Sequence, residues 1–300
     1  METPLISIII PAYNPDESFC KTILSVLNQT YENFELIIID DGSEIDTTSI
    51  INKFDDQRII YHKLEHKNAN VARNYGIAIS NGKYIAMLDS DDLWLKNHLE
   101  DCLNTLRENG ADGLYGSLIL RDTKDIERPF YVRGLNKDEK MINYLLQSGY
   151  GAQTSTFFLS AESAKDILWD PLLNRHQDYD FIVRYNKRYQ LIHKEKPTAI
   201  YVCSIKEKII DFKSCIQFIK SNTDDIEPQL YNNYNLNMLL LAKNKNATSD
   251  IINHYIKEAT RHKEYLSYDK YIMIRYPENW CEKFKYKLEY LFHIIRLKVE

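Results

Sequence analysis

The chain has 300 residues, 44% of them hydrophobic and 27% charged, and its formal net charge is −5. This composition is that of a folded globular protein, and it provides no overall positive field that would hold a nucleic acid backbone. Five widely spaced cysteines without a C-x-x-C pair argue against a disulfide framework and against a zinc site. The first residues carry neither a basic segment nor a long apolar one, so we expect a cytoplasmic protein.

The first part of the chain alternates short apolar runs with amphipathic segments, which is the pattern of helices packed against a mostly parallel sheet. We expect strands at 5–10, 34–39, 58–62 and 84–88. Pro11 should end the first of these strands. We expect helices between the strands, at 18–29, 47–54 and 70–80. The alternation predicts an α/β fold.

Beyond residue 110 the predicted elements become mixed. We expect strands at 114–120, 130–132, 154–159 and 199–203, and helices at 138–147 and 178–189. From about residue 206 the pattern is helical to the end of the chain, without strand signals. We therefore predict an α/β domain over residues 1–205 and a helical C-terminal region over residues 206–300.

Two acidic turns follow buried strands of the predicted sheet, DDGS at 40–43 and DSDD at 89–92. The carboxyl ends of parallel strands meet at one edge of a sheet, and ligands of open α/β sheets bind at that edge. The three carboxylates of the second turn repel one another, and a divalent cation would relieve the repulsion. Two simpler interpretations stay open: DDGS suits a tight turn, and DSDD suits the acidic start of a helix.

Five segments match, in order, the motifs of a known family. They are SIIIPAYN (7–14), QTY (29–31), IDDGS (39–43), ARNYGI (72–77) and GKYIAMLDSDD (82–92). With these segments the chain resembles the family 2 glycosyltransferases of GT-A fold, and the resemblance extends over about residues 5–205. It implies a Rossmann-like, mostly parallel mixed sheet that binds a nucleotide sugar.

The resemblance also implies roles for individual residues of the donor site. Asp41 would hold the nucleobase, and Arg73 would approach the nucleotide, although Arg73 alone also suits an ion pair on a helix surface. Asp91 would bind a divalent cation, Mn²⁺ or Mg²⁺, that bridges the diphosphate. The other implied donor-binding residues are Pro11, Ala12, Tyr13, Asp89 and Ser90.

The segment HQDYDFIVR (176–184) resembles the family's (E/Q)-D-Y-D-L-W-L-R segment, whose first aspartate is the general base of inverting members. This resemblance assigns the base to Asp178. Without it, Asp178 and Asp180 would only add negative charge to a helix N-terminus. The implied reaction is an inverting transfer, from a donor that is most commonly UDP-linked to a hydroxyl of a glycan. The expected acceptor is a lipid-linked glycan or a cell-surface glycan such as a bacterial capsule, O-antigen or lipooligosaccharide.

Two rival functions and one departure from the family pattern bear on this prediction. A nucleotidyltransferase usually has a glycine-rich phosphate loop, which the first strand here lacks. An inactive nucleotide- or glycan-binding relative would not need Asp178 together with Asp89 and Asp91. Many relatives carry a Tyr-Arg-x-His-like segment whose histidine joins the metal site, but this chain has YVCSIK at 201–206 and so lacks that ligand.

The C-terminal segment 280–298 combines apolar and aromatic positions with lysines and arginines. Two interpretations stay open. The segment could lie in a membrane interface as a peripheral contact, with its aromatics among the headgroups and its cations toward anionic lipid. It could instead pack an apolar stripe on the helical region or on a second subunit, which would make a homodimer.

Overall fold

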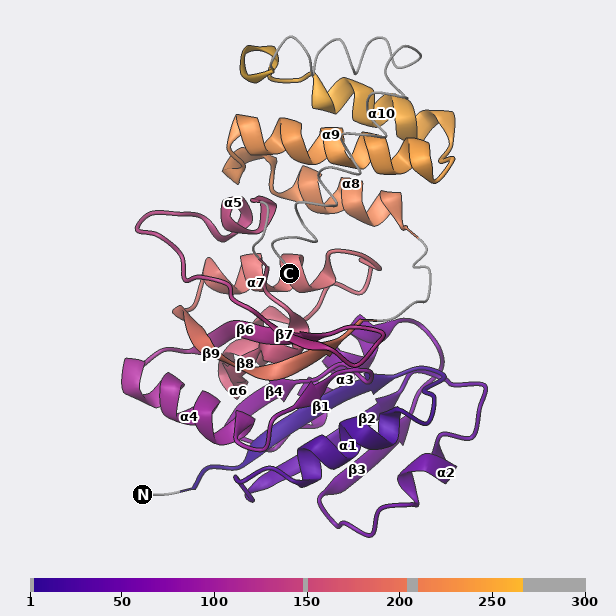
Figure 1. Ribbon diagram of the computed structural model, residues 1–300, viewed down its shortest axis with the longest axis vertical. Coiled ribbons are helices and arrows are strands. Elements are labelled where there is room, and N and C mark those ends of the chain that lie inside the picture. Colours follow the sequence, from indigo (N-terminus) through magenta and orange to yellow (C-terminus); the bar gives the residue numbers. More distant parts are fainter. Residues whose placement is uncertain (1–2, 148–150, 204–209, 267–300) are drawn as a thin grey trace. The chain divides into compact units, whose positions relative to one another are not determined.

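The computed structural model describes residues 3–147, 151–203 and 210–266 (Figure 1). The chain divides into two compact units, Met1–Met141 with Gly149–Ser214 and Ile142–Ser148 with Cys215–Glu300. The expected domain boundary near residue 205 falls among residues that are not described, so it stays a prediction. The expected contact or packing of segment 280–298 also lies outside the described residues.

A single mixed sheet is the framework of the first unit (Figure 1). Its order over the described residues is β3-β2-β1-β4-β8-β6-β9-β5, and β7 pairs with β6. β3, β2, β1 and β4 run parallel, whereas β8 runs antiparallel to both β4 and β6. The strands are β1 (Ile6–Ala12), β2 (Phe34–Asp40), β3 (Ile59–Lys63), β4 (Tyr84–Met87), β5 (Leu93–Trp94), β6 (Gly113–Arg121), β7 (Glu127–Phe130), β8 (Phe158–Ser160) and β9 (Leu191–Val202). The expected α/β fold with a mostly parallel mixed sheet is confirmed.

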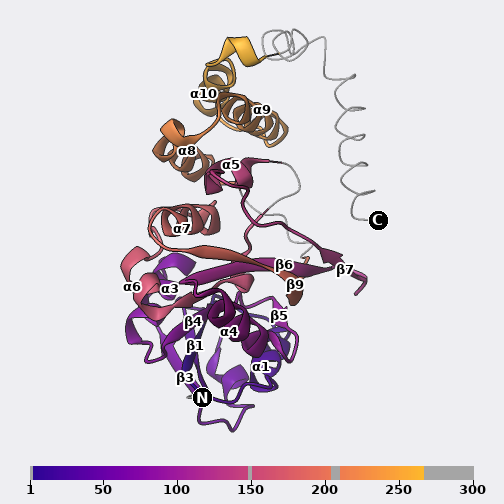
Figure 2. The same ribbon diagram turned by 90° about the vertical axis from the view of Figure 1, so that its left-hand side faces the viewer.

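Helices cover both faces of the parallel strands because successive residues of each strand point to opposite sides. Ile6, Ile8 and Ile10 of β1 belong to a core cluster with α1 and α4, whereas Ile37 and Ile39 of β2 pack with α3. Figure 2 shows the ribbons of α1 and α3 on either side of β1. The strands are therefore apolar on both faces, as buried parallel strands are. The helices of this unit are α1 (Phe19–Leu27), α2 (Thr48–Ile51), α3 (Ala69–Ile79), α4 (His98–Asn109), α6 (Ala161–Ile167) and α7 (Gln177–Asn186).

The expected end of the first strand at Pro11 is wrong, because β1 continues to Ala12. Pro11 lies opposite Ile39 of β2, while the pairing of β1 with β4 stops at Ile9 and Met87. β1 is thus an edge strand at its carboxyl end, where the missing N–H of a proline costs no sheet hydrogen bond.

Other expected elements differ from the structure in their bounds, and some elements were missed. Residues 154–156 form a 3-10 turn (Thr154–Thr156) rather than the start of a strand, and only Phe158–Ser160 pair with the sheet. β9 starts eight residues before the expected position 199, because Lys194, Glu195, Lys196 and Pro197 hide its strand pattern. The short strand β5 and the helices α4 and α6 were not predicted.

The second unit is helical in its described part. Its helices are α5 (Met141–Leu146, from Ile142 on), α8 (Phe212–Ser221, from Cys215 on), α9 (Pro228–Asn244) and α10 (Ser249–Ala259). α10 packs along α9, and the Tyr231 hydroxyl of α9 donates a hydrogen bond to Glu258 of α10 at 2.6 Å. No helix within the described ranges combines the length and the apolarity that a membrane crossing requires.

The close packing of α3 on the sheet predicts the effect of a substitution at Gly76. A Cβ atom there would lie 2.6 Å from Ile9 Cγ2, so Gly76→Ala should lower the free energy of unfolding by about 1–3 kcal/mol despite the better helix propensity of alanine. Ala78→Gly, on the exposed face of the same helix, is the control and should cost at most about 1 kcal/mol. Denaturant unfolding measures both, and an equally stable Gly76→Ala protein would contradict the packing argument.

Candidate active site

A pocket of about 230 Å³ lies at the carboxyl edge of β1, β2 and β4. These strands are parallel, so the segments that follow them meet at one edge. The pocket is lined by Pro11, Ala12, Tyr13, Asp41, Ala69, Arg73, Asp89, Ser90 and Asp91. Every residue that the sequence assigned to the donor or the metal therefore lines one pocket. Ala69, at the start of α3, also lines it and was not predicted.

The two aspartates of the DDGS turn make different contacts. Asp40 is fully buried and accepts hydrogen bonds from the Ser43 backbone N–H at 2.7 Å and the Tyr61 hydroxyl at 2.8 Å. Burial by itself would raise the pKa of Asp40, but the hydrogen bonds from Ser43 and Tyr61 outweigh it and lower the pKa. Asp40 thus holds the turn, and Asp41 is the aspartate that lines the pocket.

Asp41 is held from the loop between β3 and α3, which the sequence analysis did not single out. The Lys67 backbone N–H donates to Asp41 Oδ1 at 2.9 Å, and His66 Nδ1 lies 3.0 Å from Asp41 Oδ2. The His66 ring also stacks on Tyr13, with centroids 4.2 Å apart. Gly42 makes this approach possible, because its φ is +75° and a Cβ atom would lie 2.5 Å from His66 N.

Arg73 is buried, with 5% of its surface exposed, so the interpretation as a surface ion pair is wrong. Its guanidinium donates to Asp89 Oδ1 at 2.7 Å, to Gln177 Oε1 at 2.8 Å and to Asn70 Oδ1 at 3.1 Å. The guanidinium also lies over the Trp169 ring, 4.4 Å from its centroid. Arg73 therefore joins the strand end that carries Asp89 to the first residue of α7.

Asp92 does not start a helix, since α4 begins only at His98. Its buried carboxylate accepts hydrogen bonds from Ser155 Oγ at 2.6 Å and from the Val202 backbone N–H at 3.0 Å. Burial, followed by the charges of Asp89 and Asp91, raises the pKa of Asp92 well above its usual value. The acidic turn thus concentrates carboxylates that repel one another, and this repulsion disfavours ionisation of Asp92.

Asp178 is the second residue of α7. It follows Gln177, which accepts a hydrogen bond from Arg73. It is not among the residues that line the pocket. Burial raises the pKa of Asp178 to about 6; the backbone N–H of Tyr179 and the charge of Arg73 lower it, and the charge of Asp89 raises it. A carboxyl group with a pKa near neutrality suits a general base.

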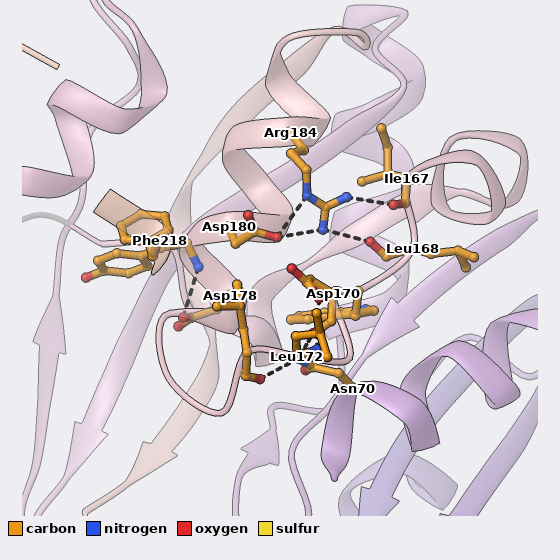
Figure 3. A network of polar contacts seen from close by, with 12 residues as sticks. Asn70, Ile167, Leu168, Asp170, Leu172, Asp178, Asp180, Arg184 and Phe218 are labelled. Atoms are coloured by element: carbon orange, nitrogen blue, oxygen red, sulfur yellow. Dashed lines mark hydrogen bonds and ion pairs between the residues drawn. The ribbon is translucent and has the colours of Figure 1, made fainter. Parts of the chain in front are cut away.

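A second ion pair fixes the helix that carries Asp178 (Figure 3). Arg184 donates from Nε to Asp180 Oδ2 at 2.8 Å, and its other nitrogens donate to the carbonyls of Ile167 and Leu168 at 2.7 and 2.9 Å. Asp180 therefore has a structural partner one turn along its own helix. Of the two aspartates in the DYD segment, this leaves Asp178 as the candidate base.

The fold and the pocket can now be compared with known proteins. The model of glycosyl transferase family 2 matches residues 7–168, which is more than half of the chain. The chain belongs to this family. It is a glycosyltransferase, and neither the nucleotidyltransferase nor the inactive relative is favoured.

Two sequence relatives are bacterial glycosyltransferases. The enzyme WfaP of Escherichia coli, named UDP-Glc:alpha-D-GlcNAc-diphosphoundecaprenol beta-1,3-glucosyltransferase, is 37% identical over 177 residues, which are 58% of this chain and 67% of WfaP. The amylovoran biosynthesis glycosyltransferase AmsB of Erwinia amylovora is 31% identical over 207 residues, which are 65% of this chain and 68% of AmsB. The matches thus span about two thirds of each relative.

Solved structures of TarS from S. aureus have a similar fold. TarS superposes with a TM-score of 0.64 at 16% identity over 88% of this chain and 50% of TarS. The TarS 1–349 complex with UDP-GlcNAc gives a TM-score of 0.60 at 17% identity, over 92% of this chain and 74% of that one. At these identities the similarity supports the fold alone, and it confirms the expected GT-A fold.

The raised pKa of Asp178 predicts how turnover depends on pH. A base must be ionised to accept a proton, so kcat/KM of this glycosyltransferase should rise with pH through about 6 and level off above it. Asp178→Asn should abolish transfer at every pH and leave donor affinity within about threefold of the wild type. A pH profile of kcat/KM and direct donor titration measure these effects. Loss of nucleotide binding in Asp178→Asn, with transfer by the bound fraction intact, would exclude Asp178 as the base.

Proposed function

We propose that this chain transfers a hexose from a UDP-linked donor to a hydroxyl of a lipid-diphosphate-linked glycan, with inversion at the anomeric carbon. The observation that carries the proposal is the pocket at the carboxyl edge, where Asp41, Arg73, Asp89 and Asp91 meet. At one end, the Tyr13 ring and the Asp41 carboxylate offer a stacking surface and a hydrogen-bond acceptor for a nucleobase. At the other end, Asp89 and Asp91 offer carboxylates for a cation that would bind the diphosphate.

The nucleobase would lie at the end of the pocket formed by Tyr13 and Asp41. The Tyr13 ring offers an aromatic surface, and the Asp41 carboxylate can accept a hydrogen bond from a ring N–H of uracil. The donor named for WfaP is UDP-Glc, and the TarS structure holds UDP-GlcNAc. Both agree with a UDP-linked hexose.

The lipid-diphosphate acceptor is inferred from WfaP, which is named for a diphosphoundecaprenol acceptor. An enzyme with such an acceptor would assemble a bacterial surface polysaccharide. It would work at the cytoplasmic face of the membrane, as a peripheral protein, because nucleotide sugars are supplied on that side and the acceptor lipid lies in the bilayer.

A divalent cation, Mn²⁺ or Mg²⁺, fits the residues of the pocket. Asp89 and Asp91 are hard oxygen ligands, and their charges already disfavour ionisation of Asp92. Within the described ranges no three His, Cys, Asp or Glu side chains form a metal site. Asp91 would therefore hold the cation together with diphosphate oxygens and water, which is how Mg²⁺ commonly binds. Once bound, the cation would offset the charge of the leaving nucleoside diphosphate.

The chain's own residues would carry the proton and the orientation of the donor. Asp178 takes the proton of the acceptor hydroxyl as that oxygen bonds to the anomeric carbon and the bond from this carbon to the diphosphate oxygen breaks. Attack from the side opposite the leaving group inverts the anomeric configuration. Arg73 keeps two residues in place through its hydrogen bonds: Asp89 of the pocket and Gln177, the neighbour of Asp178.

The nucleobase role of Asp41 predicts the effect of removing its carboxylate. Asp41→Ala should weaken UDP binding about 10- to 100-fold, because it deletes a charge-assisted hydrogen bond worth about 1.5–3 kcal/mol. Isothermal titration with UDP measures this change. Asp55→Ala is the matched control, since Asp55 is exposed in the loop before β3, at the opposite edge of the sheet. Equal UDP affinity in Asp41→Ala and the wild type would remove Asp41 from the base site.

The complete proposal is tested with UDP-glucose, UDP-GlcNAc and a GlcNAc-diphosphoundecaprenol acceptor in detergent. We expect transfer from one UDP-hexose and a product of inverted anomeric configuration. Excess chelator should abolish transfer, and Mn²⁺ or Mg²⁺ should restore it. Asp91→Asn should lower kcat about 100-fold, which corresponds to about 2.7 kcal/mol, whereas Asp55→Asn should not.

Three results would contradict the proposal. Transfer from a GDP-, CDP- or dTDP-linked sugar but from no UDP-linked sugar would refute the donor assignment. Full transfer in excess chelator would refute the cation, and wild-type turnover of Asp91→Asn would remove Asp91 from its site.

A further inference from the structure

Trp169 lies between the donor pocket and the helix of the candidate base. Its indole is almost fully buried, with 1% exposed, and the Arg73 guanidinium lies 4.4 Å from its ring centroid. The ring of Phe181 stacks on the same indole, with centroids 4.5 Å apart and planes inclined by 16°. Phe181 belongs to α7 and follows Asp178 by three residues, so it lies on the same side of the helix. One side chain thus contacts both the arginine of the pocket and the helix of the base.

The segment around Trp169, residues 168–173, is held against α3 by asparagine side chains. Asn74 bonds both backbone groups of Trp169: it accepts from its N–H at 2.7 Å and donates to its carbonyl at 2.8 Å. Asn70 donates to the carbonyls of Asp170 and Leu173 at 2.6 and 2.8 Å. Side-chain bonds to successive backbone groups leave segment 168–173 little freedom relative to α3.

The first residue of this segment, Leu168, is held by α7 (Figure 3). Leu168 adopts φ +47°, a left-handed conformation that is unfavourable for a leucine. Its carbonyl accepts a hydrogen bond from Arg184 of α7 at 2.9 Å. The backbone therefore turns sharply just before Trp169, and the turn is stabilised by the helix that carries Asp178.

The contacts of Trp169 come from its ring and not from its indole N–H. Nε1 is buried and has no hydrogen-bond partner among the described residues, although buried tryptophans usually satisfy this group. A phenylalanine would keep an aromatic face at this position without an unpaired donor. This difference separates the stacking role of the residue from hydrogen bonding.

We propose that Trp169 is a positioning residue that keeps Asp178 in register with the donor pocket. The inference rests on the proposed transferase function and deepens it. Arg73 has three hydrogen-bonding partners besides the indole, so the pocket should keep its shape when the ring is lost. α7 loses the stacking of Phe181 on the indole, so the base shifts relative to the anomeric carbon. A shift of about 1 Å in a reacting group can cost about 100-fold in rate.

The test compares Trp169→Leu with Trp169→Phe in the full chain, with UDP as binding probe and UDP-glucose with GlcNAc-diphosphoundecaprenol as substrates. We expect Trp169→Leu to lower the single-turnover rate of transfer about 10- to 100-fold. The Kd for UDP and the KM for UDP-glucose should stay within about threefold of the wild type, and the ratio of donor hydrolysis to transfer should rise. Trp169→Phe should restore most of the transfer rate.

Phe19→Leu controls for the loss of a buried ring. Phe19 is 1% exposed, and among the described residues its core cluster contains no member of α3 or α7. We expect Phe19→Leu to lower thermal stability as much as Trp169→Leu does, without the split between kcat and KM. If Trp169→Leu is not recovered in a folded form, Phe181→Leu removes the stacking partner on α7 and should give the same split.

The outcomes separate this inference from the proposed function. A wild-type chain that transfers no sugar from any UDP-hexose refutes the function itself. An active wild type would refute the positioning role in three cases: if Trp169→Leu behaves like Phe19→Leu, if UDP affinity falls in parallel with rate, or if Trp169→Phe fails to restore transfer.

Discussion

A positive charge buried next to an acidic turn is the interaction on which the rest of the site depends. Moving a guanidinium out of water is costly unless its charge and its donors are matched by partners. Arg73 matches its charge and its terminal nitrogens with Asp89, Asn70, Gln177 and the face of Trp169, while its buried Nε has no hydrogen-bond partner among the described residues. These partners come from four separate segments of the chain, so satisfying one side chain brings those segments together.

The same electrostatics acts on the other carboxylates of the acidic turn. Asp89, Asp91 and Asp92 lie within four residues, and Asp178 also feels the charge of Asp89. Arg73 pairs directly with Asp89, while Asp92 is hydrogen-bonded by Ser155 and the Val202 backbone. The mutual repulsion of these carboxylates is the physical reason for expecting a divalent cation to bind beside them. A diphosphate would add negative charge, so it would bind together with the cation.

The two ends of the pocket differ in how they are built. At the end formed by Tyr13 and Asp41, the turn after β2 is held by buried hydrogen bonds and by a glycine that admits His66 to within van der Waals contact. At the end formed by Asp89 and Asp91, Arg73 of α3 and Ser155 of the 3-10 turn at Thr154–Thr156 bond Asp89, and Arg73 in turn bonds Gln177 of α7. The contacts of the Asp40–Asp41 turn reach residues 21 and 26 positions away, whereas those of the acidic segment reach Val202, 110 positions from Asp92.

The sequence by itself determined the α/β fold and the two acidic turns, and its resemblance to a known family implied the pocket residues other than Ala69. The fold and the place of the turns follow from local patterns: apolar runs make buried strands, and the carboxyl ends of parallel strands share an edge. Even so, the pattern wrongly ended the first strand at Pro11. The strand can include this proline because β4 is too short to pair with it. Only the tertiary structure decided that Arg73 is buried, that Asp92 is a structural acid and that His66, Ser155 and Trp169 support the site. Their roles depend on partners distant in sequence, and no spacing along the chain records which side chains folding will bring into contact.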